Sequence, residues 1–139
     1  MSDKFFIDTN ILVYAHDTED PEKQQKAQAV IFEGIRSDKA VVSTQVISEF
    51  YVIITQKIKS PLPRSKAKEE TKQLAILEMV EIDLPLIFQA INYQEQWKIS
   101  YWDALILASA DRAQCPKIFS EDFKHQHKYG DIIVENPFM

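Results

Sequence analysis

The chain has little glycine and a single cysteine, and both features exclude classes of function. Its 139 residues contain only Gly34 and Gly130, so no glycine-rich loop can cradle the phosphates of a nucleotide cofactor. The lone Cys115 cannot form an internal disulfide, which suits a reducing cytoplasm. We expect this thiol to be a small buried hydrophobe.

Long apolar runs and an excess of positive charge are also missing. No stretch is long enough to cross a bilayer, and the polar residues 1–4 do not resemble a signal peptide, so we expect a cytoplasmic protein without membrane contact. A net charge of −5 lacks the basic footprint of a protein that binds nucleic acid through phosphates alone. The length and the 45% hydrophobic content predict one domain over residues 1–139.

Strand patterns alternate with helix patterns along the chain. Apolar periodicity and helix-capping residues predict helices over residues 10–15, from 21 onward, and over 44–58, 65–79, 84–97 and 100–113. Short strands are predicted near residues 5–7, 40–43, 80–82, 117–120 and 132–134. Strands separated by helices pair in parallel through right-handed crossovers, which predicts an α/β fold.

Four carboxylates stand where such a fold would gather them at one end of the sheet. Asp8 and Asp122 follow predicted strands, and ligands of open α/β sheets collect at the carboxyl ends of strands. Glu49 and Asp103 lie on the apolar stripes of predicted helices, where an ionised carboxylate is costly unless it is paired or binds a metal. Carboxylates without histidine or thiolate favour a hard cation such as Mg²⁺. The pattern suggests a metal-dependent nuclease.

Each acid also has a purely structural explanation. Asp8 could cap a short helix, and Asp103 fits a capping box that begins at Ser100. Asp122 could serve a turn, and Glu49 could lie at the exposed edge of its stripe. These explanations do not predict that all four acids recur at strand ends and on helices in a repeating order.

The polar neighbours of the acids allow two roles. Thr9, Asn10 and Ser120 could orient the carboxylates by hydrogen bonding, and they serve equally well as caps. Glu121 could replace its neighbour Asp122 as the fourth acid.

Several motifs are similar to those of a known family. They are residues 6–12 (FIDTNIL), 43–51 (STQVISEFY), 100–106 (SYWDALI) and 120–123 (SEDF). The chain resembles the PIN-domain family in these motifs and their order, and the closing VENPF at 134–138 is similar to the end of its VapC-type toxin branch.

The resemblance implies a fold, an activity and partners. The implied fold is a three-layer α/β/α sandwich with a short, mainly parallel five-stranded sheet. The implied activity is that of an endoribonuclease that binds Mg²⁺ or Mn²⁺ and cleaves an RNA substrate. The implied partners are an antitoxin protein and a second copy of the chain in a homodimer. The family's acids correspond to Asp8, Glu49, Asp103 and Asp122, and its polar residues beside the first acid correspond to Thr9 and Asn10.

Contacts outside the acidic site are less determined. Lys57, Lys59 and Arg64 could contact RNA phosphates, or could lie on an ordinary solvated face. A second apolar stripe over residues 50–58 indicates either core or a protein-binding surface. The alternatives to a toxin are a housekeeping RNA-processing nuclease of the same fold, a non-catalytic interaction module, and a phospho-acceptor receiver domain.

Overall fold

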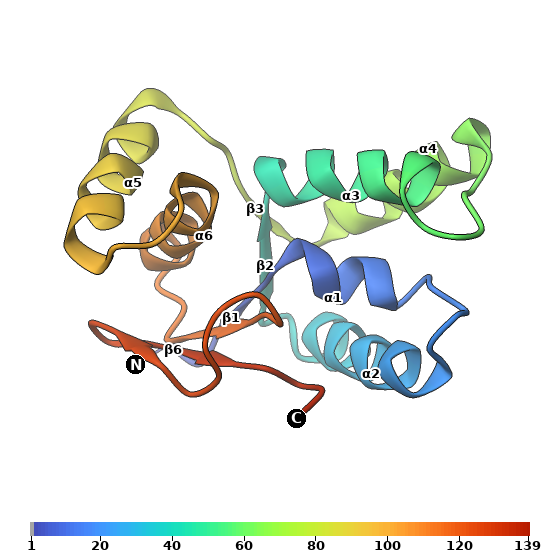
Figure 1. Ribbon diagram of the computed structural model, residues 1–139, viewed down its shortest axis with the longest axis horizontal. Helices are drawn as coiled ribbons and strands as arrows, with labels where there is room; N and C mark the ends of the chain where they lie inside the picture. Colours follow the sequence, from blue (N-terminus) through green and yellow to red (C-terminus); the bar gives the residue numbers. More distant parts are fainter. Residues whose placement is uncertain (1) are drawn as a thin grey trace.

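Strands and helices alternate along residues 2–139, the part of the chain that the structure, a computed structural model, describes (Figure 1). The strands are β1 (Phe5–Ile7), β2 (Ala40–Ser43), β3 (Glu78–Val80), β4 (Lys117–Phe119), β5 (Lys128–Tyr129) and β6 (Ile132–Glu135). The helices are α1 (Thr9–Tyr14), α2 (Pro21–Ser37), α3 (Thr44–Gln56), α4 (Arg64–Gln73), α5 (Leu84–Trp97) and α6 (Tyr101–Arg112), with a 3-10 turn η1 (Leu74–Ile76).

Side-chain caps start most of the longer helices. The side chains of Asp20, Ser43, Asp83 and Ser100 each accept a hydrogen bond from the backbone N–H three residues on. These bonds satisfy donors that the first turn of a helix leaves free. Of the capping box expected at Ser100, one half is present: its hydroxyl accepts from the N–H of Asp103 at 3.1 Å, and among residues 2–139 no hydrogen bond returns from the Asp103 carboxylate to the N–H of Ser100.

The sheet has the order β3-β2-β1-β4-β6-β5, and within the described residues it contains six strands, not the five expected. All neighbours pair in parallel except β5, which runs antiparallel to β6. The missed strand, β5, is only Lys128–Tyr129, too short to show an alternating pattern in the sequence. A turn at Gly130, with φ of 62°, joins it to β6.

One helix is also shorter than expected. The helix expected over residues 65–79 ends at Gln73, and β3 begins at Glu78, two residues before the expected strand. Between them lies the continuous apolar run 74–77, where neither helical nor strand periodicity marks a boundary.

The elements form three layers around one core, so the α/β/α architecture is confirmed. Figure 1 shows α1 to α4 on one side of the sheet, and α5 and α6 on the other. Helix α2 lies so close to β2 that a Cβ at Gly34 would stand 2.4 Å from Cβ of Ala40. Cys115 is buried, and this burial raises the pKa of its thiol to about 12, so it is the small hydrophobe expected.

The second apolar stripe of α3 is core and not a free surface. Phe50 and Ile54 are fully buried, and Tyr51 and Ile58 pack against the core from its edge. Among residues 2–139, no helix combines the length and the apolar character that a membrane crossing requires.

The sheet topology fixes the place of a site. From β1 the chain winds through β2 to β3 in one direction, and β4 and β6 continue the sheet on the other side of β1. The strand order therefore reverses between β1 and β4, and the connections that leave these strands diverge. A crevice at the carboxyl ends of the two strands is the usual ligand site of such a sheet.

Candidate metal centre

Asp8 lies at this crevice, directly after β1. Its Oδ1 accepts the N–H of Thr9 at 2.7 Å, so the residue is the N-cap of α1. Its Oδ2 accepts the hydroxyl of Ser120 at 2.7 Å and the side-chain amide of Asn10 at 3.4 Å. The side chain is thus held from both sides, and the residue is only 4% exposed.

The surroundings of Asp8 oppose its ionisation. The pKa of its carboxyl is raised from 3.8 to about 7, mainly by burial and in smaller part by the nearby charges of Asp122 and Asp103. The hydrogen bonds from Ser120 and Thr9 lower it but do not compensate. Burial is the largest cause of the raised pKa.

The two helical acids approach from opposite sides of the crevice. Glu49 comes from α3, and its Oε1 accepts the hydroxyl of Thr9 at 2.9 Å. Asp103 stands in the first turn of α6, where it is partly buried. Burial raises the pKa of Asp103, as do the charges of Asp122 and Glu49. Asp103 therefore belongs both to the capped first turn of α6 and to the acidic cluster.

The structure separates the roles of Glu121 and Asp122. Glu121 forms an ion pair with Lys23, whose Nζ also donates to the hydroxyl of Tyr14 at 3.3 Å. The side chain of Asp122 makes no hydrogen bond or ion pair with any part of the described chain, 2–139. Its backbone N–H donates to Ser120 Oγ at 3.0 Å, which turns the loop after β4 toward the crevice. Asp122 is thus the better candidate for the fourth acid.

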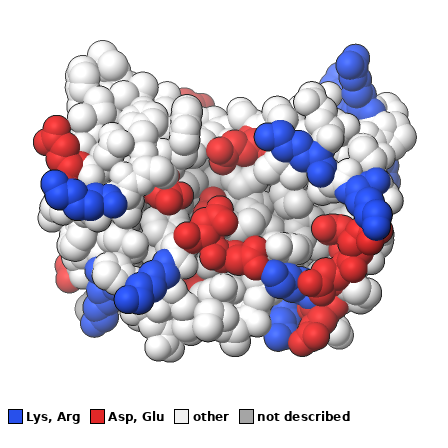
Figure 2. Space-filling model, viewed as in Figure 1, with Lys and Arg blue, Asp and Glu red and all other residues white. Residues whose placement is uncertain are grey.

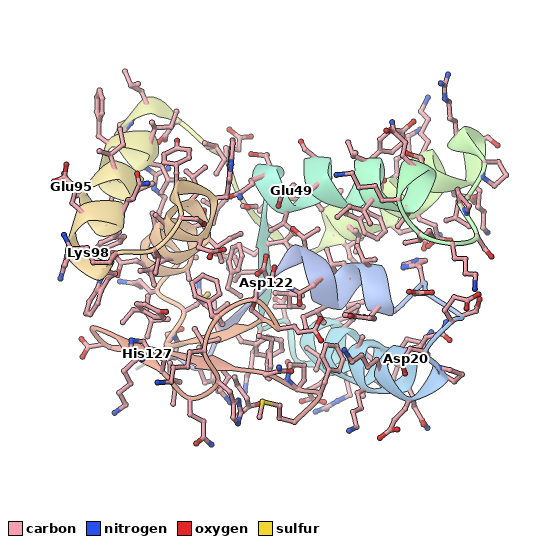
Figure 3. The ribbon with its side chains drawn as sticks, viewed as in Figure 1. Asp20, Glu49, Glu95, Lys98, Asp122 and His127 are labelled. Atoms are coloured by element: carbon pink, nitrogen blue, oxygen red, sulfur yellow. The ribbon has the colours of Figure 1, made fainter. Side chains whose placement is uncertain are left out.

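All four acids line one cavity of about 360 Å³. Figure 2 shows acidic side chains gathered in a hollow at the centre of this face, with Lys and Arg around it. Figure 3 places Glu49 on α3 and Asp122 near α1, with Glu95 on α5 and Lys98 directly after that helix at the outer edge. The lining residues are Asp8, Thr9, Asn10, Val13, Tyr14, Asp17, Gln45, Glu49, Ile53, Trp102, Asp103, Ile106, Glu121 and Asp122. Ser120 is fully buried beneath Asp8.

The donor set fits a hard, hydrated cation. The four acids supply carboxylate oxygens, and no histidine or cysteine lines the cavity among residues 2–139. Within the same residues, no three acidic, histidine or cysteine side chains are close enough to enclose an ion directly. Mg²⁺ commonly uses one or two carboxylates and keeps several waters, so an open acidic cavity suits it better than a closed cage would.

The three basic residues expected to contact RNA have different neighbours in the structure. Lys57 lines a shallow hollow together with Glu49, next to the acidic cavity. Lys59 forms an ion pair with Glu19 at 3.6 Å. Arg64 is exposed at the start of α4 and lines neither hollow. Of these three residues, Lys57 is therefore the one best placed beside the acids.

Sequence reasoning missed several residues of the site, among them Asp17, Lys23, Gln45 and Trp102. Lys23 gives no local signal, because its partner Glu121 is 98 positions away. Gln45 and Trp102 lie inside recognised motifs, beside the cap of α3 and before Asp103, but nothing in the motifs singles them out. The only available signal was a tryptophan in the first turn of a helix that carries a candidate metal ligand.

The fold and the acidic crevice define a class of α/β protein. Its carboxylate site lies at the switch point of a parallel sheet, which is the place where the strand order reverses. The family profile described as the PIN domain matches residues 5–131. The chain belongs to the PIN domain family. A comparison with curated proteins finds no match.

Solved structures share this fold at low sequence identity. A toxin–antitoxin complex from Klebsiella pneumoniae aligns with a TM-score of 0.70 and 17% identity, over 96% of this chain and 98% of that chain. VapBC2 from Rickettsia felis, bound to a DNA fragment from their promoter, gives 0.66 and 18% over 95% and 97%. VapC20 from Mycobacterium tuberculosis, a sarcin–ricin loop cleaving toxin, gives 0.65 and 13% over 86% and 90%. The chain therefore has the fold of these toxin structures.

The raised pKa of Asp8 predicts a pH-dependent stability of the metal-free protein. Because the folded pKa is about 7 against 3.8 for the free group, the contribution of Asp8 is fully present below about pH 4 and is lost as the pH rises through 7. The parent should lose up to about 3 kcal/mol of unfolding free energy between about pH 5 and about pH 8, at about 1.4 kcal/mol per pH unit. Asp8→Asn should remove most of this loss, as measured by urea unfolding with a chelator present.

A matched variant separates this effect from a general change of charge. Asp131→Asn removes the same charge at an exposed position and should keep the pH dependence of the parent. If the Asp8→Asn variant and the parent have the same free energy of unfolding at about pH 8, burial does not oppose the ionisation of Asp8.

Proposed function

We propose that this chain is a metal-dependent endoribonuclease, the toxin of a toxin–antitoxin pair. The observation that carries the proposal is the convergence of Asp8, Glu49, Asp103 and Asp122 on one cavity at the switch point of the sheet. The fold is that of solved toxin structures, one of which is described as a sarcin–ricin loop cleaving toxin. The lone buried thiol supports the cytoplasm as its location.

The acids would hold the ion. Asp8, Glu49 and Asp103 are the proposed ligands of Mg²⁺ or Mn²⁺, with Asp122 as a fourth that acts directly or through water. When bound, such an ion supplies positive charge for the phosphate and lowers the pKa of water for hydrolysis of a phosphodiester bond.

The remaining polar groups of the site position these acids. Ser120 and Thr9 donate hydrogen bonds to Asp8 and Glu49, which fixes their carboxylate planes. Thr9 serves both acids, because its backbone N–H bonds to Asp8 and its hydroxyl bonds to Glu49. Lys23 holds Glu121 in an ion pair at the rim and so reduces the negative charge that faces an incoming phosphate.

A bound cation also reconciles the acidic composition with an RNA substrate. The net charge of −5 would repel a polyanion, and the acidic residues of the cavity place part of that charge at the site itself. Divalent ions there would invert the local field. Lys57, which lines the hollow beside Glu49, would add a phosphate contact next to the centre.

An apolar groove supports an antitoxin partner. It is a hollow of about 520 Å³ between α2 and η1, in which Phe32 is 69% exposed and Ile76 is 68% exposed. Such large apolar side chains at a groove commonly mark a protein-binding surface. We assign this groove to an apolar segment of the antitoxin.

A stripe on α5 supports a homodimer. Leu84, Phe88 and Ile91 repeat at helical spacing and stay at least 40% exposed. An isologous contact between two copies would cover this stripe on both. A receiver domain is a poorer alternative, because Glu49 and Asp103 come from helices and lie at the same cavity as Asp8.

The metal proposal predicts both stabilisation and a loss of cleavage. Millimolar Mg²⁺ or Mn²⁺ should raise the melting temperature of the parent. The corresponding gain in the free energy of unfolding is about 2.7 kcal/mol where the ion is at 100 times its Kd. Asp8→Asn and Asp103→Asn should lose this rise and reduce RNA cleavage more than about 100-fold while remaining folded. Asp131→Asn should keep both. Metal-independent melting of the parent, or full cleavage by either site variant, would refute the metal centre.

The proposed phosphate contact predicts a change in salt dependence. Lys57→Ala, made in the inactive Asp103→Asn background, should weaken RNA binding and reduce the slope of log K against log salt by about 0.7 for each lost contact. Lys26→Ala, on the exposed side of α2, removes the same charge and should leave the slope as it was. An unchanged slope for Lys57→Ala would assign this lysine to the solvated surface.

The two apolar surfaces predict separable assembly defects. Phe88→Glu should convert a dimer to a monomer by light scattering and still bind the proposed antitoxin partner. Phe32→Glu should remain dimeric and lose that partner, because a charge would be buried in the groove. If neither variant changes its assembly, both surface assignments fail.

A further inference from the structure

Trp102 is an exposed tryptophan at the edge of the acidic cavity. It stands in the first turn of α6, directly before Asp103, and lines the same cavity as the four acids. Its side chain is 62% exposed, so it contributes little to the core. A large aromatic face left open beside a polar site indicates recognition of a ligand, because tryptophan gains most when its ring is covered.

The position of Trp102 is held by neighbours on two sides. The side-chain Nε2 of Gln45, on α3, donates to the backbone carbonyl of Trp102 at 3.2 Å and so ties α6 to the helix that carries Glu49. This orientation leaves Gln45 Oε1 buried without a donor among residues 2–139, a cost that the tether must outweigh. The Tyr101 ring packs edge-to-face against the indole, with centroids 5.2 Å apart.

The other exposed apolar residues do not share this location. The groove between α2 and η1 and the stripe on α5 both lie outside the acidic cavity. Of the large apolar side chains that are strongly exposed within residues 2–139, Trp102 alone lines that cavity. A contact with a protein partner therefore accounts for those surfaces better than for this residue.

We propose that Trp102 stacks on an unpaired nucleobase of the RNA, next to the phosphodiester bond that the acids receive. This inference rests on the proposed nuclease function and names a substrate class for it, namely RNA whose bases are free to unstack. Aromatic side chains stack on any base, and single-stranded loops present bases that duplexes keep stacked. Double-stranded RNA should therefore be a poor substrate.

Two substitutions at Trp102 test the stacking by cleavage kinetics. With Mg²⁺ and a single-stranded oligonucleotide, Trp102→Ala should raise KM roughly 10- to 100-fold, the effect expected from the loss of one stacked base. Trp102→Phe should restore most of the affinity, because it keeps an aromatic face. Met139→Ala removes a large exposed apolar side chain outside the cavity and should keep the parental KM. Melting curves with metal confirm that each variant is folded.

A fluorescence measurement detects the base directly. The chain has two tryptophans, so Trp97→Phe leaves Trp102 as the sole indole. Rapid mixing with RNA should quench this fluorescence before cleavage begins. An oligonucleotide with an abasic sugar at the stacked position should bind without quenching.

The outcomes separate this inference from the nuclease proposal. Parental KM for Trp102→Ala, or equal quenching by the abasic oligonucleotide, overturns the stacking while cleavage stands. A change only in the mass of the assembly assigns Trp102 to a protein interface and overturns it as well. If the parent cleaves no RNA but its Trp102 is quenched in a base-dependent way, the stacking holds and the nuclease function fails.

Discussion

The hydrogen bond from the Ser120 hydroxyl to the buried carboxyl of Asp8, at 2.7 Å, joins the carboxyl ends of β4 and β1 where the strand order reverses. The backbone N–H of Thr9 completes the cradle and starts α1 from the same carboxyl. Burial raises the pKa of this group to about 7, so the fold holds an acid in a place that disfavours its charge. The site around it depends on this constraint, since a cation there would relieve it.

The other acids of the cavity also disfavour ionisation of their neighbours. Asp103 and Asp122 both raise the pKa of Asp8, and the charge of Glu49 raises that of Asp103. Lys23 pairs with Glu121 at the rim, whereas Asp122 has no ion-pair partner among residues 2–139. The fold thereby distinguishes two adjacent acids, one neutralised by a lysine and one facing the cavity.

Large exposed apolar side chains lie both away from the acidic cavity and beside it. The groove between α2 and η1 and the stripe on α5 lie away from the acids, where a protein partner could cover them without filling the cavity. Trp102 instead lines the acidic cavity, with its side chain 62% exposed and its backbone carbonyl bound to Gln45 of α3. A rigid aromatic beside a polar cavity can order a flexible chain at little entropic cost to the protein.

Local patterns in the sequence determined the alternation of strands and helices, because buried side chains repeat with the period of each element. They also determined the caps at Asp20 and Ser100, because a capping side chain marks the start of its helix. The four acids were found from their places relative to these elements. The local patterns did not determine β5, which is too short to show a period, or the helix-to-strand change within the apolar run 74–77. Only the tertiary structure decided that Lys23 neutralises Glu121 and that Trp102 shares a cavity with Asp8, since contacts between residues far apart in the sequence depend on how layers pack.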